Sequence, residues 1–173
     1  MTTPDPFLSL PHLYHFTDRR NLDTIRQYGG LWPLASLKKG NVVIPAAGGN
    51  EWSHDADERI GMDRYVHLCF RNSHPMEYAA RQDGRIADTI FLRIHPAVLN
   101  FPGVMFTDDV SNKSGVVAHP IANAGTMIDF QILYTRTDWS DPAIMERLKR
   151  AEKYEVLVPQ KIPLNHIGNM PNG

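Results

Sequence analysis

Near its two ends the chain carries two short strand-like stretches, L-Y-H-F-T at 13–17 and Y-E-V-L-V at 154–158. The first places the imidazole of His15 and the hydroxyl of Thr17 at the end of an early strand. The second places the carboxylate of Glu155 inside an otherwise apolar strand. Burying an acid is costly unless a partner binds it. Glu155 is therefore the first candidate for a functional residue, and a solvent-exposed position on an edge strand is the alternative.

The hydrophobic pattern between these stretches favours an α+β fold. Further strands are expected at 65–70, 89–94 and 104–107, and helices at about 19–28, 76–81, 125–134 and 142–153. Gly29-Gly30 is expected to end the first helix, and Ser140-Asp141-Pro142 is a strong helix start. Residues 33–64 are expected to form a long loop, and 162–167 to trail off after the last strand. The chain lacks the strand–helix–strand rhythm and glycine fingerprint of a doubly wound sheet.

The composition is typical of a soluble globular protein, with 42% hydrophobic and 21% charged residues among 173, and we expect one domain over 1–173. The formal net charge is −1, so contact with nucleic acid requires a local basic patch. Neither a signal peptide nor an apolar run of membrane-spanning length is visible, so we expect a cytoplasmic protein with no membrane partner. The single cysteine, Cys69, is expected to be a small buried hydrophobic residue.

Two further groups of residues bear on what the chain can bind. The eight histidines show no spacing typical of metal ligands, so no metal is expected. The run E-R-L-K-R at 146–150 is most simply the solvated face of a helix. Because it lies just before the last strand, Lys149, Arg150 and Lys153 are also candidates for contacts with phosphates.

Five motifs occur in order along the chain. They are Y-H-F-T-D-x-x-N-L-x-x-I-x-x-x-G-G-L at 14–31, D-R-Y-V-H-L-C-F at 63–70, N-S-H-P-M-E-Y at 72–78, T-D-W at 137–139 and Y-E-V-L-V-P at 154–159. Together they resemble the DarT family, the DNA ADP-ribosyltransferase toxins of toxin–antitoxin pairs. The resemblance implies an ADP-ribosyltransferase-like split β-sandwich with peripheral helices, which binds NAD in a cleft.

The resemblance also implies roles for individual residues. It assigns NAD binding to His15, Phe16, Thr17, Asn21 and Tyr65, and catalysis to Glu155 and an arginine on the loop before the Tyr-Val strand. Arg59 matches that arginine best by its spacing from the preceding histidine, and Arg64 is the alternative. The task of the acid is chemically clear. Breaking the bond to nicotinamide leaves positive charge on the ribose, which a nearby carboxylate stabilises.

The implied function is transfer of ADP-ribose from NAD to a base in single-stranded DNA, in a toxin–antitoxin or phage-defence system. Chemistry on a base favours an unpaired or flipped substrate. An antitoxin such as a macrodomain-type ADP-ribosyl hydrolase is the expected protein partner. Two alternatives stay open at this point. The same fold acts on RNA or protein acceptors, or the chain is a non-catalytic nucleotide-binding module in which Glu155 is structural.

Overall fold

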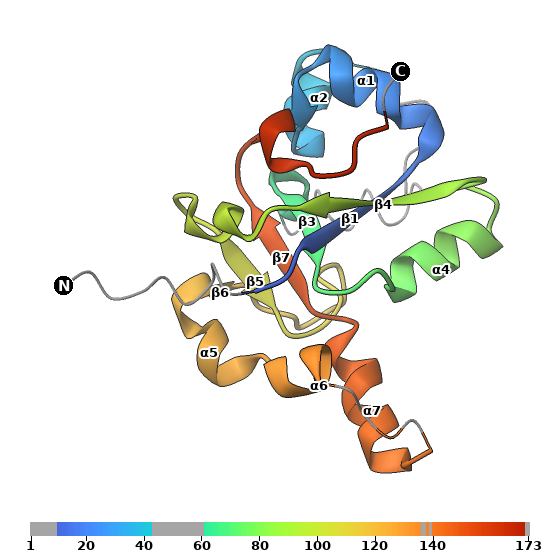
Figure 1. The fold of residues 1–173 in the computed structure, drawn as a ribbon. Helices are drawn as coiled ribbons and strands as arrows, with labels where there is room; N and C mark the ends of the chain where they lie inside the picture. The colour runs from blue at the N-terminus through green and yellow to red at the C-terminus, as the bar shows by residue number, and fades with distance from the viewer. Residues whose placement is uncertain (1–9, 43–60, 136–137, 139, 172–173) are drawn as a thin grey trace.

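A computed structural model describes residues 10–42, 61–135, 138 and 140–171. Its centre is an antiparallel sheet of six strands in the order β4-β1-β3-β7-β5-β6 (Figure 1). These strands are β1 (Leu13–Asp18), β3 (Val66–Cys69), β4 (Thr89–Ile94), β5 (Met105–Thr107), β6 (His119–Pro120) and β7 (Glu155–Val158). A second, two-stranded sheet pairs β2 (Gly30–Leu31) with β8 (Ile162–Pro163). The mixture of helices with antiparallel strands confirms the α+β class.

The register of the large sheet places Glu155 at its centre. β7 pairs with β3 on one side and with β5 on the other, so Glu155 lies opposite both Cys69 and Thr107. β1 pairs along its whole length with β4. Its registered pairing with β3, by contrast, consists of Tyr14 opposite Cys69. The sheet is therefore joined at one point between two better-paired halves, β4-β1 and β3-β7-β5-β6.

The helices lie in two groups, apart from α4 (Pro75–Gln82), which follows β3. α1 (Leu22–Gln27) and α2 (Leu34–Lys39) lie together with the C-terminal segment at one end of the molecule (Figure 1). α5 (Ala124–Met127), α6 (Phe130–Tyr134) and α7 (Pro142–Ala151) lie at the other end. Short 3₁₀ segments span Arg19–Asn21, Met62–Arg64, Pro96–Asn100, Ile121–Asn123 and Leu164–His166.

Local signals in the sequence account for several of these boundaries. The Asp18 side chain accepts from the backbone of Arg20 at the start of the first helical turn. Asp141 caps α7 in the same way, with Pro142 in the first turn, as expected from the sequence. Gly29 ends the first helix with a φ of 74°, a conformation that glycine adopts without strain.

Three expectations about the fold were wrong. The part of 33–64 that the structure describes is not all loop, because α2 forms within it. The segment 125–134 is two short helices rather than one, because Asp129 starts a new helix by accepting from the backbone of Ile132. The chain after β7 does not simply trail off, because β8 returns to pair with β2.

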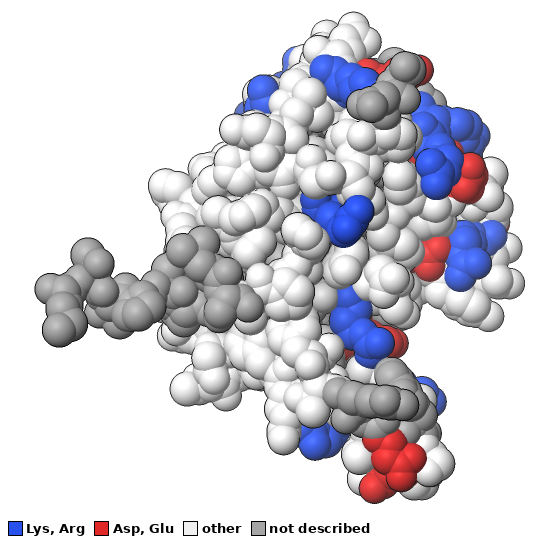
Figure 2. All heavy atoms as spheres, in the orientation of Figure 1, with Lys and Arg blue, Asp and Glu red and all other residues white. Residues whose placement is uncertain are grey.

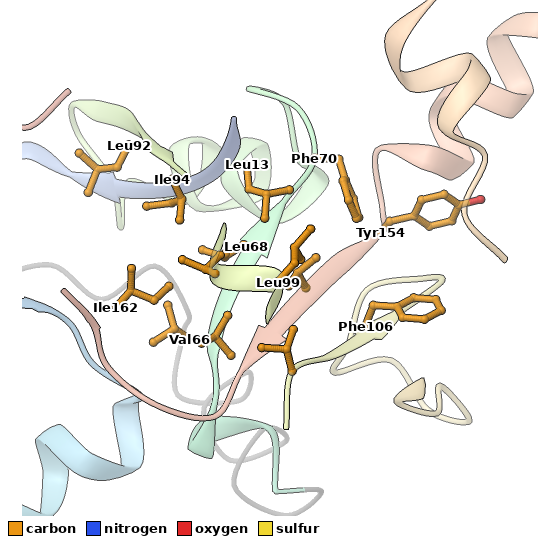
Figure 3. Close-up of a cluster of buried hydrophobic side chains, with 14 of the residues drawn as sticks. Leu13, Val66, Leu68, Phe70, Leu92, Ile94, Leu99, Phe106, Tyr154 and Ile162 are labelled. Atoms are coloured by element: carbon orange, nitrogen blue, oxygen red, sulfur yellow. The ribbon is translucent and has the colours of Figure 1, made fainter. Parts of the chain in front are cut away.

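One continuous core supports the sheet. Leu13, Leu68 and Leu99 meet at the centre of the cluster drawn in Figure 3, with Val66 and Ile162 on one side. Phe106, fully buried, extends the cluster toward β5. The apolar residues at every second position of 65–70 and 89–94 are buried, namely Val66, Leu68, Phe70, Ile90, Leu92 and Ile94. His67 and Glu155 lie on the opposite face of β3 and β7, beside Cys69 and Leu157.

Candidate active site

Glu155 is the first residue of β7 and is 6% exposed. Its Oε1 lies 3.0 Å from His67 Nδ1 and accepts from the Ser111 hydroxyl at 3.2 Å. Its Oε2 accepts from the backbone N–H of Ser111. The alternative of an exposed acid on an edge strand is excluded, because β7 lies between β3 and β5 and the side chain is buried among these partners.

The carboxyl of Glu155 is held in its ionised form. Burial alone raises the pKa of a carboxyl group. Here the hydrogen bond and charge of His67 and the backbone N–H of Ser111 outweigh burial and lower the pKa of Glu155 below its ordinary value. The site therefore contains a buried negative charge at neutral pH.

His15 connects β1 to this site. Its Nδ1 donates to the backbone carbonyl of His67 at 2.9 Å, across the region where β1 and β3 have separated. Burial is the main cause that lowers the pKa of His15, and the nearby His67 lowers it further. The ring is therefore neutral at pH 7, with its proton on Nδ1 and Nε2 left as an acceptor.

Thr17 and Asn21 lie together just beyond His15. Both are buried, and Asn21 Nδ2 donates to Thr17 Oγ1 at 2.9 Å. Between them Asp18 is fully buried, and its Oδ2 accepts from Arg20 Nη2 at 2.9 Å and from the backbone N–H of Ala87 at 2.8 Å. These bonds attach the end of β1 to the segment before β4.

Two aromatic contacts border the same region. Phe16 stacks on His74, with ring centroids 5.8 Å apart. His74 is buried, and burial lowers its pKa. Its Nδ1 accepts from the backbone of Met76, and its Nε2 has no hydrogen-bond partner among the described residues. Tyr65 stands just before β3, with the Arg64 guanidinium 5.5 Å above its ring.

The structure thus links Glu155, through His67, to His15 on β1, with Thr17 and Asn21 following. Arg59 lies outside the described residues, so its position is not part of this description. Arg64, the alternative, ends the 3₁₀ segment Met62–Arg64.

Sequence reasoning missed two residues of the site, His67 and Ser111. Val66, Leu68 and Phe70 alternate with His67, which places His67 on the other face of the strand; this is a weak signal of function. Ser111 follows β5 in an irregular segment and carries no motif. Ser111 Oγ and Glu155 Oε1 both meet His67 at Nδ1. A hydrolytic Ser–His–acid triad requires opposite ring nitrogens, so these three residues do not form one.

An open groove of about 850 Å³ lies beside α7, the helix that precedes β7 in the chain. One wall is the segment 108–119 that contains Ser111, and the other is α7. The cations that line it are Lys113, Lys149, Arg150 and Lys153, and the acids are Asp108, Asp109 and Glu146. On the face drawn in Figure 2, lysines and arginines are likewise scattered, several beside acids.

Among the described residues, no group of three or more His, Cys, Asp or Glu side chains is arranged to hold a metal ion. No helix in the same part of the chain is long and apolar enough to cross a membrane.

The DarT family model, described as ssDNA thymidine ADP-ribosyltransferase, matches residues 14–170. The chain belongs to this family. DarT proteins are NAD-dependent enzymes that transfer ADP-ribose to single-stranded DNA, as the resemblance of the five motifs predicted. No relative among curated protein sequences matches the chain.

Solved DarT structures share the fold. Thermus sp. 2.9 DarT in complex with ADP-ribosylated ssDNA has a TM-score of 0.68 at 19% identity, over 96% of this chain and 81% of that one. The same enzyme in complex with NAD+ has a TM-score of 0.62 at 20% identity, with the same coverage. Thermosipho africanus DarTG in complex with ADP-ribose has a TM-score of 0.65 at 15% identity, over 91% of this chain and 43% of that one.

Proposed function

We propose that this DarT protein transfers ADP-ribose from NAD to a thymidine base of single-stranded DNA, with Glu155 as its catalytic carboxylate. One observation carries the assignment of Glu155. In a chain of this family, a buried and ionised carboxylate lies on the strand next to the point where β1 and β3 separate. A buried charge is retained only where hydrogen bonds hold it, and the bonds from His67 and Ser111 do so here.

We propose that NAD binds along β1 and the turn after it, through His15, Phe16, Thr17 and Asn21, with Tyr65 at the entrance to β3. The Nε2 acceptor of His15 supports this proposal. A carboxamide, such as that of nicotinamide, offers a donor to such an acceptor.

The proposed reaction breaks the bond between nicotinamide and the ribose C1′ and forms a bond from C1′ to a ring nitrogen of the base. Positive charge develops on the ribose as the first bond breaks, and the carboxylate of Glu155 stabilises it. The base nitrogen loses its proton as the second bond forms. Glu155, or the arginine proposed at position 59, orients the base and assists removal of that proton.

We further propose that the fold is a split β-sandwich and that residues 1–173 form one domain. The limited pairing of β1 with β3, beside the long pairing of β1 with β4, supports a sheet that opens into two halves. A single buried cluster includes residues from both halves, such as Leu13, Val66 and Val156.

The groove between 108–119 and α7 is the proposed path of the DNA. It lies between α7, which leads into β7, and the segment 108–119 that contains Ser111, so a strand lying in it would pass near the end of β7 that carries Glu155. Lys149, Arg150 and Lys153 line this groove and are proposed to contact phosphates. Acids beside them, such as Asp109 with Lys113, moderate the charge of the groove.

A macrodomain-type ADP-ribosyl hydrolase is proposed as the antitoxin. The Thermosipho africanus DarTG chain supports this, because it is longer than the part this chain matches and was solved with ADP-ribose. The cytoplasm, where NAD and DNA are both available, is the proposed compartment.

The test is a transfer assay with NAD labelled on its adenylate phosphate. Acceptors are a single-stranded oligonucleotide with one thymidine, the same oligonucleotide with deoxycytidine in its place, an RNA oligonucleotide and a protein. We expect label on the thymidine oligonucleotide alone. Glu155→Gln should reduce the rate by about 100-fold or more, the effect of losing one preorganised electrostatic group. Glu152→Gln is the matched control, because Glu152 pairs with Arg71 instead and is expected to leave the rate unchanged.

Three results would contradict the proposal. Labelling of RNA or protein in preference to DNA would change the substrate. Equal labelling of both DNA oligonucleotides would remove the thymidine assignment. Full activity of Glu155→Gln would remove the catalytic role of the carboxylate. In cells, induced wild-type protein should arrest growth and the Glu155→Gln variant should not.

A further inference from the structure

The ring of His67 lies between a backbone carbonyl and the carboxylate of Glu155. Its Nε2 is 2.8 Å from the Met62 carbonyl oxygen. Its Nδ1 is 3.0 Å from Glu155 Oε1 and 3.1 Å from Ser111 Oγ. A carbonyl oxygen only accepts, so Nε2 carries a proton.

A second proton lies between His67 Nδ1 and Glu155 Oε1, by the same reasoning. If Nδ1 and Oε1 both presented lone pairs at 3.0 Å, they would repel each other, so a proton lies between them. It belongs to the imidazole if the carboxyl is ionised, and His67 and Ser111 hold the pKa of Glu155 low. His67 is then an imidazolium that donates through both nitrogens, and its bond to Glu155 is charge-assisted.

We propose that His67 is a positioning residue that holds Glu155 in one orientation and in its ionised form. The Met62 carbonyl fixes the ring, the ring fixes Oε1, and the backbone of Ser111 fixes Oε2 from the other side. A carboxylate held from two sides keeps its position when substrate binds. The proposal rests on the catalytic role proposed for Glu155.

Two other titratable groups of the described residues that interact electrostatically with His67 are His15 on β1 and His74 before α4. Burial lowers the pKa of both, so they are neutral at pH 7 and do not compete for the carboxylate. Activity should therefore fall at alkaline pH, where the proton shared by His67 and Glu155 is lost.

Two substitutions separate the two contacts of the ring. The amide nitrogen of an asparagine occupies approximately the place of Nδ1, so His67→Asn keeps a neutral donor for Glu155 and loses the bond to Met62. The amide of a glutamine reaches approximately the place of Nε2, so His67→Gln keeps the bond to Met62 and loses the donor for Glu155. Both are assayed as full-length chains with NAD and the thymidine oligonucleotide between pH 5.5 and 9.

We expect kcat of His67→Gln to fall by about 10–100-fold, as for loss of a group that orients a catalytic ligand, with KM for NAD nearly unchanged. His67→Asn should recover much of kcat and should lack the alkaline decrease seen in the wild type. Unchanged kcat in His67→Gln would overturn the proposal, as would a loss confined to KM, which would make His67 an NAD contact. If Glu155→Gln is also fully active, the catalytic role proposed for Glu155 fails as well. If Glu155→Gln is inactive while His67→Gln is fully active, only the role of His67 fails.

A measurement on the wild type does not depend on whether the variants fold. In ¹⁵N spectra of histidine-labelled protein at pH 7.5, above the ordinary imidazole pKa of about 6.5, one ring should retain protons on both nitrogens. That signal should be absent from the spectrum of Glu155→Gln. A wild-type spectrum in which every ring carries a single proton would overturn the proposal.

Discussion

Replacing Asp18 by asparagine should destabilise the protein, although Asp18 is not proposed to touch substrate. Asp18 joins the end of β1, with its candidate NAD residues, to the segment before β4. Its Oδ1 accepts from the backbone and Nε of Arg20, and its Oδ2 accepts from Arg20 Nη2 and the backbone of Ala87. An asparagine keeps one acceptor oxygen but turns an NH₂ group toward donors on the other side.

The size of the loss follows from the donors left without an acceptor. An unsatisfied buried N–H costs about 1–3 kcal/mol, and at least two donors lose their partner in Asp18→Asn, so we expect a loss near 3 kcal/mol in the free energy of unfolding. For a chain of this length the midpoint of thermal unfolding should fall by about 6–12 °C. The ion pair itself adds little, because the Arg20 side chain is 53% exposed.

The loss of stability in Asp18→Asn should depend on pH and should be smaller at acidic pH. The hydrogen bond from the Arg20 side chain is the main cause that holds the pKa of Asp18 well below its usual range. A carboxyl with a depressed pKa stabilises the fold above its unfolded-state pKa of about 4, and this contribution is lost as the pH falls toward the folded-state value. The difference in stability between wild type and Asp18→Asn should thus be constant from pH 5 to 8 and shrink below pH 4.

Urea unfolding, followed by circular dichroism at each pH, measures this difference. Asp23→Asn is the matched control, because Asp23 is 97% exposed and pairs with Arg26 on the same helix. It should change the free energy of unfolding by less than about 0.5 kcal/mol. If Asp18→Asn and Asp23→Asn were equally stable at pH 7, or if their difference grew as the pH fell, the reasoning would be refuted.

Two further predictions concern close packing. Gly30→Ala should lower the free energy of unfolding in urea by about 3 kcal/mol or more, because a Cβ there would lie 2.1 Å from the Ile162 carbonyl oxygen. Gly125→Ala is the control. A Cβ at Gly125 meets no atom within 4 Å, so this substitution should be neutral or stabilising. Cys69 should react with Ellman's reagent only after unfolding, since burial and the charge of Glu155 raise the pKa of its thiol; rapid reaction of the folded protein would contradict this.

The parts of the fold that could be predicted have local causes. The strand at 89–94 was predicted with its correct bounds because apolar and polar residues alternate along it, and the start of α7 was predicted because Asp141 and Pro142 form a cap by themselves. The pairing of β2 with β8 joins residues more than a hundred positions apart through two residues on each strand, and so short a strand leaves no periodic pattern. α2 buries none of its residues, so it has no apolar stripe to detect.

In the candidate site, too, one residue could be predicted from a local pattern and others could not. Glu155 was visible because a charged residue interrupts an apolar strand. His67 and Ser111 were not, because they approach Glu155 only through the pairing of β3 and β5 with β7, across 88 and 44 positions of the chain. A sequence gives the residue types of such a contact but no sign that the residues meet.

These two residues also explain how Glu155 can be buried and still be available to substrate. An ionised carboxylate offers about four acceptor positions. The His67 ring, the Ser111 hydroxyl and the Ser111 backbone together supply three donors. They offset the cost of burying the charge, and they leave one position that no hydrogen bond from the described residues fills. In the proposed reaction that position suits a ribose hydroxyl, which would complete the coordination of the carboxylate where the positive charge develops.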